Sequence, residues 1–261
     1  MQTKSLKIIT WNTRRIYSNN IDFWNYFNEI NPDIALLQEV KELPILEEYS
    51  SYSVFPLTSH DTNQKFQTVI LVRGKIIGDI ELKTDKEWIN ELLEKYKGNI
   101  VAKKIFVKDK EINLINVYSP AWPIQVSPKI DLKGVKLINN MELWLADILR
   151  YALKNINQND NWIIGGDFNL SETFDYPINK GNKEYLDGMR DLGFIECLTT
   201  FNGRLIPTFK NPVDKCINHQ IDHLFVSTIL KDKLIDCRVG EQIVFERNMS
   251  DHLPIIAELS F

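Results

Sequence analysis

Polar side chains that suit phosphate chemistry lie at the ends of four apolar segments of this chain. The mostly apolar run 161–165 leads into Gly166-Asp167-Phe168-Asn169, which predicts a buried strand that ends in a carboxylate and an amide. Two other segments end in the same way at Asn12 and at Glu39, and the adjacent Asp251 and His252 come just before a fourth apolar segment, 255–259. Carboxylate and amide oxygens are preferred ligands of hard cations. The chain therefore predicts a Mg²⁺ site, which Mn²⁺ could also fill, at one end of a sheet.

Two further groups complete an ordered set. Tyr118 ends the apolar run 112–118, and Asp222 precedes His223 in the run 220–226. A single aspartate at a strand end is more often a turn or capping residue than a ligand, so the prediction depends on the whole set. Because neighbouring strand residues point to opposite faces, we expect His223 to lie away from a site that Asp222 faces.

Composition limits the classes of protein to which the chain can belong. Its 261 residues, 44% of them hydrophobic, suffice for a large core, and its net charge of −4 is unlike that of strongly basic nucleic-acid-binding proteins. Contact with phosphates must therefore come from a local patch. The three cysteines are far apart, which predicts neither a disulfide framework nor a zinc site. With no leader and no apolar run long enough to span a bilayer, we expect a cytoplasmic protein without a membrane partner.

Short segments rich in Val and Ile predict many strands with helices between them. The predicted strands are 6–11, 33–38, 52–55, 68–72, 75–82, 100–107, 112–118, 162–165, 220–226, 234–239 and 254–259, and the predicted helices are 20–30, 84–97, 132–155 and 183–192. In the longest helix, Val135, Ile138, Met141 and Leu145 recur at helical spacing, so we expect this face to be buried. The number of strands favours an α/β fold of two packed sheets with helices outside.

In its order from Thr10 to Pro254, the set of motifs resembles the endonuclease/exonuclease/phosphatase superfamily, which includes exonuclease III and deoxyribonuclease I. The resemblance implies one domain over residues 1–261 with a four-layer α/β sandwich, in which two packed mixed β-sheets are flanked by helices. It also implies a metal-dependent phosphoric ester hydrolase whose site lies at one end of the paired sheets.

The resemblance further implies roles for the residues that would bind the metal. Glu39 would be the main Mg²⁺ ligand, with Asn12 and Asp251 close by. Asp167 and Asn169 would hold the nucleophilic water, or a second metal and the phosphate. The metal would neutralise charge as the negatively charged phosphodiester is attacked, and it would stabilise the leaving oxygen.

The remaining members of the set would handle protons and phosphate oxygens. Tyr118 would donate to a phosphate oxygen. His252 would contact the scissile phosphate or act as the general base, with Asp222 orienting its imidazole. The attacking water must lose a proton. Either His252 or Asp167 would receive it, and the sequence leaves both alternatives open.

Tyr118 favours the exonuclease III branch, since relatives nearer to deoxyribonuclease I carry a histidine at this position. The chain departs from the abasic-site endonucleases in two places. Those enzymes have Asn or Gln where Ala121 follows Pro120, and an acid shortly after the first Asn, where this chain has Thr13-Arg14-Arg15. These residues therefore do not favour a role in abasic-site repair.

Two further residues are candidates for substrate binding. Arg14 follows a site residue, and its guanidinium suits phosphate oxygens; the alternative is an ordinary solvent-exposed loop arginine. Trp122 begins the segment 122–136, where we expect an exposed loop that selects the substrate.

Three functions are consistent with these residues. The first is a nuclease that acts on DNA or RNA, with nucleic acid as its substrate and no indication of a protein partner. The second is a phosphatase or phosphodiesterase for small phosphorylated metabolites or lipid head groups, which the mild acidity of the chain favours. The third is a non-catalytic binding module, which the presence of every expected catalytic residue disfavours.

Overall fold

The computed structural model describes residues 5–57, 64–213 and 215–261. Its framework is a pair of six-stranded sheets. In spatial order, the first sheet contains β11 (Leu234–Val239), β12 (Ile255–Ser260), β1 (Ser5–Ile16), β2 (Ile34–Val40), β4 (Gln67–Val72) and β3 (Ser50–Val54). The second contains β5 (Lys75–Asp79), β6 (Ile100–Val107), β7 (Lys110–Tyr118), β8 (Trp162–Asp167), β10 (Asp222–Ser227) and β9 (Phe194–Glu196).

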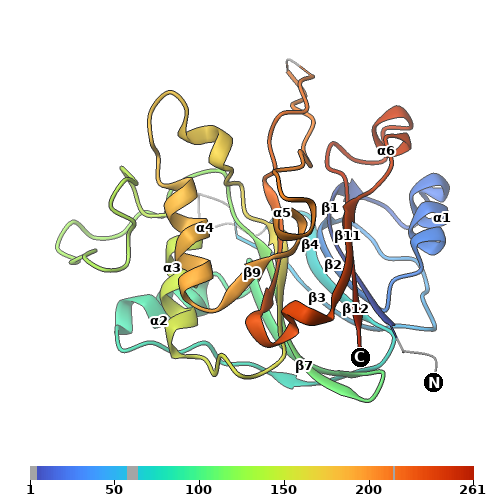
Figure 1. Ribbon diagram of the computed structural model, residues 1–261, viewed down its shortest axis with the longest axis horizontal. Helices are drawn as coiled ribbons and strands as arrows, with labels where there is room; N and C mark the ends of the chain where they lie inside the picture. Colours follow the sequence, from blue (N-terminus) through green and yellow to red (C-terminus); the bar gives the residue numbers. More distant parts are fainter. Residues whose placement is uncertain (1–4, 58–63, 214) are drawn as a thin grey trace.

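Helices cover both outer faces of the paired sheets (Figure 1). The first sheet is covered by α1 (Ile21–Ile30) and α6 (Ile243–Glu246), and the second by α2 (Glu87–Lys95), α3 (Leu145–Ala152) and α4 (Asn182–Asp191). The short helix α5 (Cys197–Asn202) contributes Cys197 and Leu198 to the core between the sheets. This arrangement confirms the predicted four-layer α/β sandwich.

Apolar side chains fill each of the three spaces between the layers. Leu36, Leu114 and Leu224 belong to the cluster between the sheets. Phe23 and Phe27 of α1 join a second cluster on the first sheet, and the buried side chains of α2, α3 and α4 join a third on the second sheet. The sequences of these strands are nearly continuous runs of Val, Ile and Leu because the strands are buried on both faces.

The strand directions bring the polar strand ends together. In the first sheet β1 runs parallel to β2, with Asn12 beside Gln38. In the second sheet β7 runs parallel to β8, with Tyr118 beside Asp167. Because the carboxyl ends of parallel strands meet at one edge of a sheet, both pairs lie at or near the ends of their strands, and the bond between Asn12 and Asp167 shows that they share one end of the sandwich. The loops that follow rise at the top of Figure 1.

Two consecutive glycines let backbones approach closely at this end. A Cβ atom on Gly165 would lie 2.9 Å from a methyl group of Leu36 in the opposite sheet. A Cβ atom on Gly166, where φ is +155°, would lie 2.0 Å from the carbonyl oxygen of Val117 in the neighbouring strand. The double glycine before Asp167 is therefore required by packing between and within the sheets.

All eleven predicted strands have counterparts, whereas β9, α5 and α6 were not predicted. The prediction of one helix over 132–155 is wrong, because the helix comprises only Leu145–Ala152, followed by a 3-10 turn at Leu153–Asn155. Ile138 and Met141, predicted to be buried, are 90% and 96% exposed.

Local hydrogen bonds explain why the long helix does not form. The Asp147 carboxylate accepts bonds from the backbone N–H groups of Leu137 and Trp144 and from the side chain of Asn140. Gly134 adopts a left-handed conformation, with φ of +76°. Side chains that bond to nearby backbone groups compete with a continuous helix, so residues 132–144 form turns over the start of α3.

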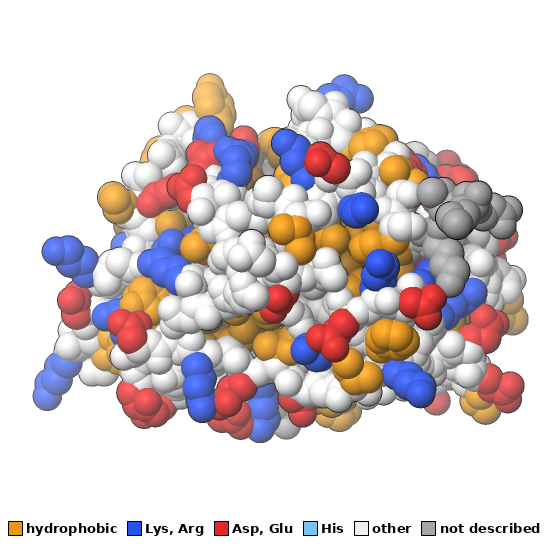
Figure 2. Space-filling model, turned by 60° about the horizontal axis from the view of Figure 1, so that its bottom comes forward, with side chains coloured by type: hydrophobic (Ala, Val, Ile, Leu, Met, Phe, Trp, Pro, Cys, Tyr) orange, Lys and Arg blue, Asp and Glu red, His pale blue; other side chains and the backbone are white. Residues whose placement is uncertain are grey.

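None of the helices in the described ranges has the length and apolar character needed to cross a bilayer. Figure 2 shows the molecule with the bottom of Figure 1 brought forward. Acidic and basic side chains alternate over this surface, without an extended region of one sign.

Candidate active site

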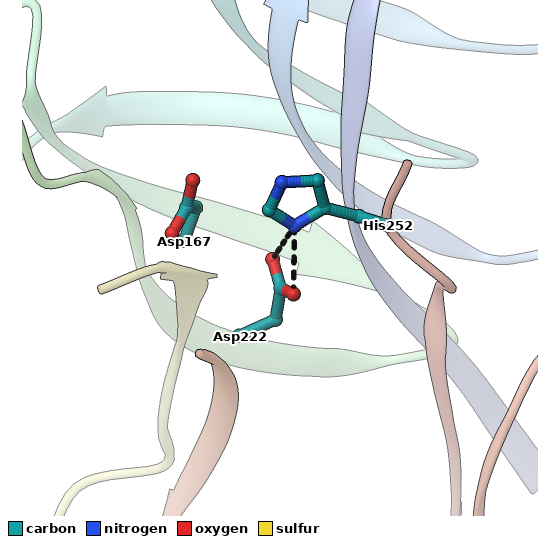
Figure 3. Close-up of side chains that lie close together, drawn as sticks. All are labelled: Asp167, Asp222 and His252. Atoms are coloured by element: carbon teal, nitrogen blue, oxygen red, sulfur yellow. Dashed lines mark hydrogen bonds and ion pairs between the residues drawn. The ribbon is translucent and has the colours of Figure 1, made fainter. Parts of the chain in front are cut away.

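Asp167, Asp222 and His252 converge at the end of the sandwich where the parallel strands finish (Figure 3). Asp167 ends β8 and lies opposite Asp222, the first residue of the antiparallel strand β10. His252 enters from the other sheet, three residues before β12. One potential ligand atom from each residue lies within 4.8 Å of the other two.

The Asp222 carboxylate holds the His252 imidazole. Nδ1 of His252 lies 2.9 Å from one carboxylate oxygen and 3.1 Å from the other, so Nδ1 donates to Asp222 and Nε2 faces away from it. Asp222 is itself held by Thr208, whose hydroxyl donates to Oδ2 over 2.7 Å. The contact places Asp222 where it could orient the imidazole, and this role of Asp222 stays a prediction.

The backbone around His252 is tied to β1. The indole Nε1 of Trp11 donates to the His252 carbonyl oxygen over 2.8 Å. Ser250 accepts a bond from the His252 N–H and donates its own hydroxyl to the carbonyl oxygen of Asn12. These bonds position the imidazole relative to the first sheet, although its carboxylate partner belongs to the second.

Three carboxylates determine the protonation of His252. Burial by itself would lower the pKa of the imidazole, but the charge of Asp222 and its hydrogen bond raise the pKa to about 10, with further contributions from Asp167 and Asp251. Nε2 lies 3.9 Å from Asp251 Oδ1. In this surrounding His252 carries a proton on both ring nitrogens at neutral pH.

Asp167 is a buried carboxylate with mainly neutral partners. One oxygen accepts the backbone N–H of Asn169, and the other accepts the Asn12 amide over 2.9 Å. Burial raises the pKa of Asp167 to about 7; the charge of His252 opposes this shift and that of Asp222 adds to it. Asp167 can therefore exchange a proton near neutral pH, which suits a general base.

Oxygen ligands for a hard cation lie beside this carboxylate. The Asn12 side chain extends from Asp167 towards Glu39, with its Nδ2 3.5 Å from Glu39 Oε1. The Tyr118 hydroxyl donates to the same Glu39 oxygen over 3.2 Å. Burial, first, and the charge of Glu39, second, raise the pKa of Tyr118 above its usual value, so the hydroxyl keeps its proton.

The donor set fits Mg²⁺ or Mn²⁺. Glu39, Asn12, Asp167 and Asp251 offer only carboxylate and amide oxygens, which hard cations prefer. Burial, first, and the charge of Asp222 raise the pKa of Asp167, so a cation beside this carboxylate would favour its charged form. Asp222 is less available because it is bound to His252.

Unusual backbone conformations gather around these ligands. Arg14, Arg15, Glu39 and Asn169 have φ values of 49°, 63°, 57° and 51°. Among non-glycine residues, such left-handed conformations persist only where the surrounding structure enforces them, and they cluster at functional sites. The strain therefore coincides with the candidate metal and phosphate ligands.

Both arginines that follow Asn12 lie beside the carboxylates. Nε of Arg14 is 3.5 Å from Asp251 Oδ2, and Nε of Arg15 is 3.7 Å from Glu39 Oε2. Their side chains remain half-exposed or more. Of the two alternatives for Arg14, the position favours a guanidinium at the rim of the site.

Trp122 is not exposed as predicted. Its side chain is half-buried, its indole Nε1 is buried, and within the described ranges this nitrogen has no hydrogen-bond partner. Trp122 differs from an exposed loop aromatic because the surrounding protein covers part of its side chain. In the part of the chain that the structure describes, Trp122 makes no polar contact with the carboxylates of the site.

Sequence reasoning missed Thr208, Ser250 and Trp11 as residues that position the site. Only Ser250 had a local signal, its place directly before the Asp251-His252 pair. His223 is fully buried on the opposite face of β10, where Nε2 lies 3.1 Å from the Leu170 carbonyl oxygen, which confirms that it lies away from the site.

The fold and the acid-rich strand ends define a class, the phosphoric ester hydrolases with a deoxyribonuclease I-like sandwich. The model of the Endonuclease/Exonuclease/phosphatase family matches residues 9–252, and the chain belongs to this family. No protein with a curated description matches the chain in sequence.

Solved structures share the whole architecture. The catalytic domain of Xenopus laevis APE2 superposes with a TM-score of 0.67 at 19% identity, covering 98% of this chain and 93% of that one. An AP endonuclease from Archaeoglobus fulgidus gives 0.65 at 20% identity, covering 97% and 98%. The 3′ phosphatase NExo from Neisseria, bound to a product DNA hairpin, gives 0.66 at 19% identity, covering 98% and 100%.

Proposed function

We propose that this protein is a Mg²⁺-dependent phosphodiesterase, and specifically a nuclease that hydrolyses phosphodiester bonds of DNA or RNA. The observation that carries the proposal is the His252 imidazole, which Asp222 holds close to the buried Asp167, whose carboxylate is in turn linked to Glu39 through the Asn12 amide. Similar structures described as AP endonucleases and as a DNA-bound 3′ phosphatase support nucleic acid as the substrate.

Each residue has a role in the proposed reaction. A water oxygen attacks phosphorus while Asp167 takes the water proton, and the P–O bond opposite the attack breaks, so that the leaving oxygen keeps the electron pair. The Nε2–H of His252 and the hydroxyl of Tyr118 donate to phosphate oxygens, where negative charge accumulates. Asn169, fixed by a bond from its amide to the Ser119 carbonyl oxygen, contacts the phosphate.

Glu39, Asn12 and Asp251 would hold the cation. Mg²⁺ in this place supplies charge neutralisation for the phosphate and stabilises the leaving oxygen. Arg14 would contact a phosphate oxygen from the rim of the site, and Trp122 would line the substrate path after Tyr118.

The test is cleavage of labelled single- and double-stranded DNA and RNA with Mg²⁺, with Mn²⁺ and with EDTA. We expect metal-dependent products from the wild type and a rate lower by about 10²-fold or more for Glu39→Ala. Glu47→Ala, a change at an exposed acid outside the site, is the control.

Phosphorylated metabolites and lipid head groups form the comparison panel. Turnover of these compounds without cleavage of any strand would replace the nuclease proposal with the small-ester alternative. Absence of turnover on both panels by folded wild-type protein would contradict the hydrolase mechanism.

A further inference from the structure

A polar pocket of about 190 Å³ adjoins the candidate active site. Three separate parts of the chain contribute to it: Arg14 of β1, residues 210–212 with Lys215, and the segment 245–251 before His252. In Figure 1 the orange loop and the red α6 segment both rise at the top of the molecule. The volume is below the range of about 300–1,000 Å³ typical of small-molecule sites, so it suits one chemical group.

Positive charge dominates the lining. Among the lining residues that the structure describes, Arg14, Lys210 and Lys215 are the cations and Asp251 is the carboxylate. Nζ of Lys210 lies 5.5 Å from the centre of the Phe245 ring, and in the part of the chain that the structure describes no carboxylate is within ion-pair distance of it. This local excess of positive charge contrasts with the net charge of −4 of the whole chain.

Hydrogen bonds from backbone N–H groups fix the position of the pocket relative to the active site. The N–H of Lys210 donates to the Asp251 carbonyl oxygen over 2.8 Å. The N–H of Arg14 donates to Asn12 Oδ1 over 3.0 Å, and its Nε is 3.5 Å from Asp251 Oδ2. A group bound in the pocket would therefore lie at a set position relative to the scissile bond.

We propose that this pocket binds a second phosphate group of the substrate, beside the phosphate that is hydrolysed. The inference rests on the proposed phosphodiesterase function and narrows its substrate class. Guanidinium and ammonium groups are the protein cations that bind phosphate. A substrate that fills both sites carries at least two linked phosphates, as a polynucleotide strand does and an ester with a single phosphate does not.

The first test measures binding of a fluorescein-labelled single-stranded DNA oligonucleotide in EDTA at several KCl concentrations. Lys210→Gln should weaken binding about threefold to tenfold and reduce the slope of log Kd against log salt by about 0.7, the value for one phosphate contact in a single strand. Lys75→Gln, at an exposed lysine of β5 remote from the strand ends, should leave both quantities unchanged.

The second test compares substrates. Lys210→Gln should raise KM for an oligonucleotide more than KM for bis(4-nitrophenyl) phosphate, which has one phosphate. An unchanged salt slope, or equal effects on the two substrates, would overturn the second phosphate site while leaving the hydrolase function intact. Conversely, a wild type that binds the strand with the expected Lys210 dependence but never cleaves it would contradict the proposed function and retain the pocket. A wild type that binds no strand would overturn the pocket.

Discussion

Nδ1 of His252 lies 2.9 and 3.1 Å from the two carboxylate oxygens of Asp222, although these residues belong to opposite sheets. The pair is buried, and Thr208 supports the carboxylate from behind. One hydrogen-bonded contact thus joins the sheets at the candidate active site and selects the ring nitrogen that remains for the substrate.

Replacing Asp222 with Asn should reduce kcat with little change in fold. Loss of the Asp222 charge would lower the pKa of the imidazole, and a ring without positive charge stabilises the phosphate oxygens less in the transition state, so we expect kcat to fall by about 10²-fold. The measurements are kcat, KM and the ¹⁵N NMR shifts of the ring. Asp232→Asn, at an exposed position, is the matched control. A full rate for Asp222→Asn would remove this pair from the mechanism.

Glu39→Gln should weaken metal binding more strongly than Tyr118→Phe. The first change removes a charged oxygen ligand, whereas the second removes only the hydroxyl that donates to it. Calorimetric titration with Mn²⁺ should show a Kd raised about tenfold or more for Glu39→Gln. We expect EDTA to abolish turnover and added Mg²⁺ to restore it. Equal Mn²⁺ affinity of wild type and Glu39→Gln would place the cation elsewhere.

In EDTA, NMR titration should show one aspartate carboxyl with an apparent pKa of about 7 and one imidazole with a pKa of about 10. Burial raises the first value; Asp222, with Asp167 and Asp251, raises the second against the effect of burial. The two groups interact, so these are properties of the pair. Asp167→Asn should abolish the lower step and shift the imidazole to lower pH, because it removes a negative charge.

The same shifts predict how stability depends on pH. Both groups bind protons more tightly in the folded state than in the unfolded chain. The contribution of Asp167 is therefore lost as pH rises from about 4 to about 7, and that of His252 as pH rises from about 6.5 to about 10. Urea unfolding of metal-free protein should show stability falling between pH 7 and 10. A rise over this interval would contradict the charge state assigned to His252.

Gly166→Ala should destabilise the fold by about 2–4 kcal/mol, since the new methyl group would collide with the Val117 backbone at a positive φ. Gly78→Ala is the control, because a Cβ atom there has no neighbour within 4 Å. Urea unfolding gives both values. Equal stability of the two variants would show that the backbone at Gly166 can relax.

Local sequence was sufficient for most of the fold and for the members of the site. Short runs of Val and Ile predicted eleven strands, and polar residues at their ends, such as Asn12, Glu39 and Asp167, lie together as expected. These signals succeed because residues close together in the sequence determine both the burial of a strand and the polar groups at its end. The helical periodicity gave a wrong prediction at Met141. Hydrogen bonds to the Asp147 carboxylate hold the preceding residues in turns instead of a helix.

Tertiary structure alone decided how the site is held and charged. Trp11 bonds to the backbone of His252 across 241 positions, and Thr208 reaches Asp222 from a separate loop. No local sequence pattern predicts such contacts, because they depend on which strands become neighbours. Burial among three carboxylates likewise determines the proton on His252, and the meeting of Arg14 with Lys210 creates a basic pocket in an acidic chain. Distance and dielectric, which set these energies, exist only after the two sheets have packed.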